Sequence, residues 1–174
     1  MRKKIMITVL FASLALTTSC GYRLSGTGLL VPEGTKTIAI PSFINNTNEP
    51  YVDLEVTKAV TDEFMVDGRL RVVDVEAAEL VLRGRVSKYE VKAISYTASN
   101  YVQQYQVRLV VDVSLDDLRS KKTIWREAGI ETVIANYSVA IGDITATKVA
   151  KEAAIRKSSQ DIGSTVRSRV LEGF

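Results

Sequence analysis

The chain has 174 residues, with 23 lysines and arginines against 20 acidic residues, and its formal net charge is +3. It has no histidine and one cysteine, Cys20, which excludes Ser-His-Asp and Cys-His nucleophilic catalysis and the usual zinc sites. Three of the basic residues precede residue 5, in a segment expected to be removed, and the remainder is balanced. No overall basic field therefore favours nucleic acid as a partner.

The first 19 residues have the three parts of a secretory signal peptide: a basic start, an apolar run over residues 5–16 and small residues before Cys20. The run is shorter than the roughly 20 residues of a membrane-spanning helix. A cysteine at this point is typical of bacterial lipoproteins, and acylation of Cys20 would anchor the chain in a membrane. Gly21 after the cysteine favours the outer membrane by the same resemblance. Two alternatives stay open: an ordinary N-terminal helix, and cleavage that leaves Cys20 a free thiol.

Residues 20–36 are rich in glycine and indicate a lipidated tether, and residues 37–174 have the length of a single domain. A short β-rich run over residues 37–43 ends near Pro41. A helix is predicted from about Pro50 to Asp67, because apolar residues recur at helical spacing before Gly68. These residues are Val52, Val56, Ala59, Val60 and Phe64.

The centre of the chain predicts long strands over residues 80–94, 101–116 and 124–137. The second strand alternates apolar and polar residues, so one of its faces belongs to a core. A C-terminal helix is predicted from an Asp143 N-cap to about residue 172, with Ile155, Ile162, Val166 and Val170 on its apolar face. The order of elements predicts an α+β domain, with two helices packed on one face of a mixed, largely antiparallel β-sheet.

Neighbouring carboxylates are the remaining candidates for acid/base chemistry, at residues 62–63 and 116–117. Both pairs fall on predicted solvated surfaces, and the chain has no glycine-rich phosphate loop. We therefore expect a protein that is not an enzyme and that uses no cofactor and no metal.

Two features are suited to binding. The first is a set of basic residues on neighbouring strands, in which Arg83 and Arg85 share one face and could contact a phosphate. The other members of the set are Lys88, Lys92 and Arg108. Lys88 and Lys92 follow the opposite alternation unless a bulge intervenes. The alternative is a solvated sheet face whose charges are balanced by Asp112 and Glu90.

The second feature is the loop "SYTASNYVQQY", which is rich in aromatic and amide side chains. A surface of this kind is suited to contact with another protein. Its candidate contact residues are Tyr96, Tyr101, Gln103 and Gln104, with Tyr105 and Asn100 beside them. Packing of tyrosines at strand ends explains the same pattern equally well.

Several segments in order resemble the LPS-assembly lipoprotein family (LptE): "CGYRLSGTG", "KTIAIPSFINNTNEPYVDLEVTKAVTDEF", "LVLRGRVSKYEV", "QYQVRLVVDVSL" and "IWREAG". The resemblance implies an outer-membrane lipoprotein on the periplasmic side, anchored through acylated Cys20. It also implies a partner, the β-barrel LPS-assembly protein (LptD), which the lipoprotein plugs, and assistance in carrying lipopolysaccharide to the cell surface. Members bind lipopolysaccharide through basic residues. Because residues 95–104 hold no lysine or arginine, this role would fall to Arg83 and Arg85, with Arg108 beside them.

Two other functions are compatible with parts of the sequence. "TIAIPSFINNT" also resembles the opening strand of lipoproteins that activate periplasmic cell-wall synthases, although the tether here is short for that task. A carrier of a lipid or peptide is the third alternative, and it would require a sizeable apolar cavity.

Overall fold

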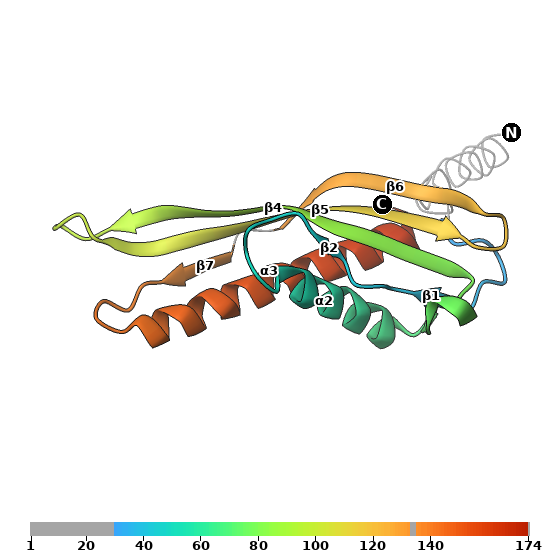
Figure 1. Cartoon of the computed structure of the whole chain (residues 1–174), viewed down its shortest axis with the longest axis horizontal. Coiled ribbons are helices and arrows are strands. Elements are labelled where there is room, and N and C mark those ends of the chain that lie inside the picture. The colour runs from blue at the N-terminus through green and yellow to red at the C-terminus, as the bar shows by residue number, and fades with distance from the viewer. Residues whose placement is uncertain (1–29, 133–134, 174) are drawn as a thin grey trace, which may run out of the picture.

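The computed structural model describes residues 30–132 and 135–173, and within them seven strands form one sheet that two helices cover (Figure 1). The helices are α2 (Val52–Asp67) and α3 (Ile144–Glu172). The strands are β1 (Thr37–Ala39), β2 (Ile44–Asn45), β3 (Arg71–Val72), β4 (Leu80–Tyr96), β5 (Val102–Asp117), β6 (Lys122–Glu131) and β7 (Ala135–Ser138), and a short 3-10 turn, η1 (Val75–Ala77), precedes β4. In these ranges no helix is long and apolar enough to cross a membrane.

The sheet is mixed, as predicted, with the strand order β3-β1-β4-β5-β6. β1 pairs in parallel with β3 and β4, and β2 pairs in parallel with a later part of β4. β4 and β5 form a long antiparallel hairpin, and β6 and β7 both pair antiparallel with β5. The hairpin therefore runs through the whole domain, and the other strands are added along its two sides.

Both helices lie on one side of the sheet, which confirms the predicted α+β class (Figure 1). The predicted apolar residues of α2 and α3 are buried, and alternate residues of β5 from Val107 to Leu115 face them. Side chains such as Phe64 and Ile162 are fully buried, and each such burial contributes about 2–3 kcal/mol. We call this side of the sheet the helix face and the opposite side the outer face.

The ends of the helices follow local sequence signals. Asp143 caps α3, because its Oδ1 accepts a hydrogen bond of 2.8 Å from the Ala146 amide. α2 ends at Gly68, which has a φ of 72° and donates its amide hydrogen bond to the Phe64 carbonyl. Glycine adopts this left-handed conformation without steric cost. The prediction that Asp67 and Gly68 end the helix is confirmed.

The single strand predicted over residues 124–137 is wrong, because the structure has two strands, β6 and β7, in this range. Thr132 interrupts the ladder: its hydroxyl oxygen accepts a hydrogen bond from the Leu109 amide at 3.2 Å, which a backbone carbonyl would otherwise accept. Gly129, with a φ of 75°, lies beside a second irregularity opposite β5. The signal peptide predicted over residues 1–19 and the anchor Cys20 lie outside the described residues.

Candidate functional site

A β-bulge in β4 decides which basic residues share the outer face. The pairing of β4 with β5 shifts between Val86 and Lys88, so that one extra residue, Ser87, enters the strand. After this shift Lys88 and Lys92 follow the same alternation as Arg83 and Arg85. A bulge therefore does intervene between Arg85 and Lys88, and the basic residues of β4 all lie on the outer face.

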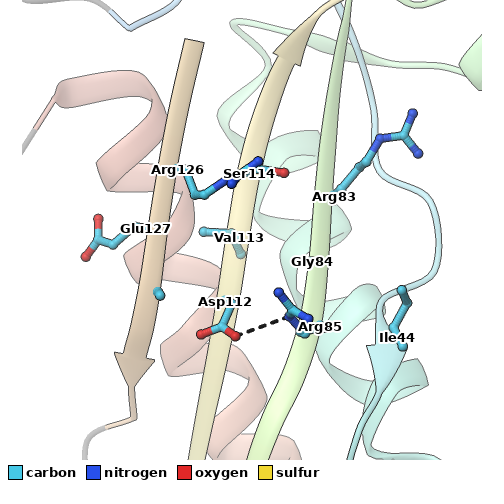
Figure 2. Close-up of a pocket in the computed structure, with 10 residues that line it drawn as sticks. Ile44, Arg83, Gly84, Arg85, Asp112, Val113, Ser114, Arg126 and Glu127 are labelled. Carbon is cyan, nitrogen blue, oxygen red and sulfur yellow. Dashed lines mark ion pairs between the residues drawn. The ribbon is translucent and has the colours of Figure 1, made fainter. Parts of the chain in front are cut away.

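The outer face is hollowed where β4, β5 and β6 run side by side (Figure 2). The hollow has a volume of about 350 Å³. Its charged lining on the outer face comes from Arg83 and Arg85 of β4, Asp112 of β5 and Arg126 of β6. A further lining residue, Glu127, points away from the hollow (Figure 2), toward Arg169 of α3, whose Nη2 lies 3.7 Å from its Oε1.

Two of the arginines are held by carboxylates in a way that leaves most of their donors available. The Arg85 Nε lies 3.2 Å from Asp112 Oδ2, while Asp112 Oδ1 accepts a hydrogen bond from the Gly129 amide at 2.9 Å. The Arg83 Nε lies 3.1 Å from Asp116 Oδ2. A guanidinium has five N–H donors, and Nε is the nitrogen that these ion pairs place next to the carboxylate. Each arginine is oriented and can still contact an anion through its terminal nitrogens.

Arg126 completes the hollow, although no sequence pattern selected this residue. It lies opposite Ser114 in the β5–β6 ladder, and Figure 2 shows it reaching from β6 across to Ser114. Among the described residues it makes no ion pair within 4.0 Å. Arg85 and Arg126 therefore flank the centre of the hollow, while the guanidinium of Arg83 lies at its rim and points away from Arg126 (Figure 2).

The structure does not bring Arg108 into this hollow. Arg108 lies opposite Glu90, whereas Arg85 lies opposite Asp112. The two positions on β5 are four residues apart, or about 13 Å along the strand. Arg108 contacts Glu131 and Glu90 instead, and these carboxylates raise its pKa, the hydrogen bond with Glu131 being the largest cause.

The second predicted surface lies at the free end of the β4–β5 hairpin. Tyr96 and Tyr101 are 57% and 67% exposed on either side of the turn, and Gln103 and Gln104 are exposed on β5. The turn itself is ordered, since the Thr97 hydroxyl accepts hydrogen bonds from the Ser99 and Tyr101 amides. The hairpin turn lies at one end of the molecule (Figure 1), so these exposed aromatic and amide groups gather at that end.

The two surfaces offer different groups to a ligand. Of the residues the structure describes, no group of three or more cysteine, aspartate, glutamate or histidine side chains is placed to hold a metal ion. The outer-face hollow offers oriented cations and one serine hydroxyl, which suits recognition of an anion. The hairpin end offers tyrosines, which suits contact with a protein.

The fold defines a class of small α+β domains known from solved structures of low sequence identity. A putative lipoprotein from Caulobacter crescentus is 11% identical with a TM-score of 0.52, over 74% of this chain and 86% of its own. The hypothetical protein CT253 from Chlamydia trachomatis is 12% identical with a TM-score of 0.51, over 78% and 98%. A minor lipoprotein from Acinetobacter baumannii is 13% identical with a TM-score of 0.51, over 80% and 92%.

The family is given by the sequence. Residues 35–170 match the family LptE, described as lipopolysaccharide-assembly. The match covers far more than half of the chain, and the protein belongs to this family. A comparison with curated proteins finds no match.

Proposed function

We propose that the protein is a lipoprotein of the outer membrane that plugs and supports the β-barrel LPS-assembly protein, LptD, and assists the transport of lipopolysaccharide to the cell surface. Membership of the LptE family carries this proposal. In it, acylated Cys20 anchors the chain on the periplasmic side, and the protein acts by binding, without catalysis. The exposed hairpin end with Tyr96, Tyr101, Gln103 and Gln104 contacts the barrel.

The outer-face hollow is the proposed contact for lipid A phosphates. Arg85 and Arg126 flank the hollow, and Arg83 lies at its rim. The acidic side chain directed into the hollow is Asp112, so cationic side chains outnumber acidic ones there. Planar guanidinium groups donate paired hydrogen bonds to phosphate oxygens. Arg108 lies about four residues further along β5, so we assign it to a separate contact with the same ligand.

The partner is tested by purification of a C-terminally tagged protein from detergent-solubilised outer membranes. Recovery of a large β-barrel in near-equal amount is the expected result. Recovery of a cell-wall synthase without a barrel would support the activator alternative instead. A protein that stays in the soluble fraction with Cys20 unmodified would contradict the anchor.

The phosphate contact is tested by binding of lipopolysaccharide to an Arg85→Ala, Arg126→Ala double variant. The matched control is Arg156→Ala, Lys157→Ala, which removes two exposed cations from α3 on the opposite layer. We expect the double variant to bind about tenfold more weakly, because each charge-assisted hydrogen bond contributes about 1.5–3 kcal/mol before solvent screening. The loss should shrink as salt rises. Equal binding by the two double variants would exclude the hollow as the site.

A further inference from the structure

On one of its sides, the distal half of β4 pairs with no strand in the part of the chain that the structure describes. β1 pairs with β4 at Leu80 and Val81, and β2 pairs with it at Arg85 and Val86. The last backbone hydrogen bond on this side runs from the Asn46 amide to the Val86 carbonyl. From Lys88 to Tyr96 the described residues pair with β4 only through β5, and Figure 1 shows this end of the hairpin extending past β2.

The pattern of the β5 hydrogen bonds identifies the backbone groups that point to the open side. Thr132 donates its amide to the Leu109 carbonyl and accepts from the Leu109 amide, so Leu109 directs both groups away from β4. Tyr89 lies opposite Leu109, and it therefore directs its own N–H and C=O away from β5. By the same alternation Val91 and Ala93 do so too. Three consecutive outward pairs of donor and acceptor form the template of a strand.

The open edge is regular where these groups lie. Pairing with β5 continues without a shift from Lys88 to Ala93, between the bulge at Ser87 and a second irregularity that begins after Ala93. Edge strands are normally short, bulged or covered. The loop of residues 46–49 lies beside the first residues of this run, where it lines a pocket with Lys88 and Tyr89. No described residue makes a hydrogen bond to the outward backbone groups of Tyr89, Val91 and Ala93, so water or a partner must satisfy them.

The charges beside the edge indicate what the partner carries. On the outer face, Lys88 lies 2.7 Å from Glu90, and Glu90 also contacts Arg108. Lys92 lies between the outward pairs of Val91 and Ala93, and among the described residues it makes no ion pair. An acidic side chain on an added strand would lie next to Lys92 at the distance of a cross-strand pair.

We infer that this edge, residues 88–93 of β4, receives an extended segment of the β-barrel partner by strand addition, with an acidic side chain of that segment opposite Lys92. The inference rests on the proposed function for the identity of the partner. Main-chain hydrogen bonds to Tyr89, Val91 and Ala93 supply the affinity, and the Lys92 contact supplies part of the specificity.

The test compares full-length Val91→Pro and Val91→Thr proteins in the tagged purification from outer membranes. Proline removes the outward N–H of Val91, which the β4–β5 ladder does not use, so the protein should keep its circular dichroism spectrum. Threonine keeps this N–H and is the matched control. We expect Val91→Pro to recover about tenfold less barrel than Val91→Thr. The proline variant loses one hydrogen bond to the added strand, and its ring clashes with that strand.

Charge reversal gives a second measurement that does not depend on a proline. Lys92→Glu should recover several-fold less barrel than Lys92→Gln, because a like charge would face the acidic side chain. Equal recovery of barrel by both members of each pair would overturn strand addition while the proposed function stands. A wild-type protein that recovers no barrel would overturn both.

Discussion

At the scale of single residues, the close approach of α2 and α3 depends on Gly163. It is buried on α3, and a Cβ added there would lie 2.8 Å from the Ala59 carbonyl oxygen and 2.9 Å from its carbon. Backbone atoms cannot move aside as the end of a flexible side chain can. The helices would have to separate to accept any side chain at this position.

We therefore expect Gly163→Ala to lower the free energy of unfolding by about 1–3 kcal/mol, the range for an overpacked core. Alanine is the better helix former by about 1 kcal/mol, so the direction of the change is diagnostic. Ser164→Ala, at the exposed neighbouring position, is the matched control and should change stability by less than about 0.5 kcal/mol. Urea unfolding of the purified protein measures both, and a more stable Gly163→Ala protein would contradict the tight contact.

Asp67 links the end of α2 to two arginines. Arg69 donates from Nε and Nη2 to its two carboxylate oxygens at 2.7 and 2.8 Å, and Arg167 Nη1 donates at 3.3 Å. The hydrogen bonds from Arg69 are the largest cause that lowers the pKa of Asp67 from 3.8 to about 2. Because the pKa is lower in the folded protein, this carboxylate stabilises the fold above about pH 4, and the contribution is lost as the pH falls toward 2.

Asp67→Asn should therefore be less stable than the wild type by about 2 kcal/mol at pH 7, and the difference should vanish near pH 2. The difference between the two proteins isolates Asp67 from the other carboxylates that titrate in this range. Asp62→Asn is the control, because among the described residues the ion pair of Asp62 is with exposed Lys58 on the surface of α2. Unfolding free energies measured between pH 7 and 2 test this, and a constant difference would exclude the titration of Asp67 as its cause.

At the scale of elements, the bulge of β4 accommodates Ser87 without turning the later side chains to the other face. Deletion of Ser87 would make Val86 and Lys88 neighbours opposite Val111 and Val110, so Lys88, Glu90 and Lys92 would stay on the outer face of a regular ladder. We expect the deletion variant to keep cooperative unfolding in a denaturant titration, because the register and the buried side chains beyond the bulge are unchanged.

The Ser87→Ala variant keeps the extra residue in the strand and removes only its hydroxyl, so it measures the contribution of the side chain alone. The Ser87 hydroxyl donates a 3.2 Å hydrogen bond to the Val110 carbonyl, and its loss should cost only about 1 kcal/mol. A deletion variant that loses cooperative unfolding while Ser87→Ala keeps it would show that the packing of the sheet requires the bulge itself.

The sequence predicts the elements that have strong periodicity and misses the irregularities between them. The alternation of β5 and the helical spacing of α2 identify the core correctly, because burial of one face requires these periods. The bulge leaves only an indirect signal, since Lys88 and Lys92 follow the opposite alternation to Arg83 and Arg85, and the spacing does not identify Ser87 as the extra residue. The sequence does not reveal the break before β7 either. Thr132 has a high β propensity, so its residue type favours a continuous strand, yet its hydroxyl interrupts the ladder.

The candidate site was predictable only in part for the same reason. Arg83 and Arg85 lie two apart on one strand, so their common face follows from the alternation alone. Arg126 joins them, and Arg108 does not, because of the registers between three strands. Register depends on bulges and on the packing of the whole sheet, which no local spacing of arginines reveals.

At the scale of the whole molecule, the two halves of the domain are unequally packed. The main core lies under the half that holds β1, β3, β6 and the C-terminal part of α3. The half toward the hairpin turn has a core cluster of three buried residues, Val107, Ala135 and Ala154. Regions with few buried apolar contacts open more easily than the rest of a domain.

Hydrogen exchange of the purified protein should show this difference. We expect the amides of β7 and of the first turns of α3 to exchange faster than those of β5 from Leu109 to Leu115, which lie in the main core. The amides of β7 and of the first turns of α3 should exchange through local opening, whereas those of β5 should exchange only when the whole domain unfolds. Equal protection of both groups would mean that the domain opens as one unit.

The length of the β4–β5 hairpin has a consequence for reach. Residues 30–36 pack where β4 begins, since Glu79 accepts a hydrogen bond from the Lys36 amide and Arg119 donates one to Thr35, while the hairpin turn lies at the opposite end (Figure 1). The 17 residues of β4 span about 55 Å, nearly twice the roughly 30 Å hydrocarbon core of a bilayer. In the proposed function, in which acylated Cys20 is the anchor, a hairpin of this length aligned with the membrane normal would traverse the depth of the membrane from the leaflet that holds the acyl chains.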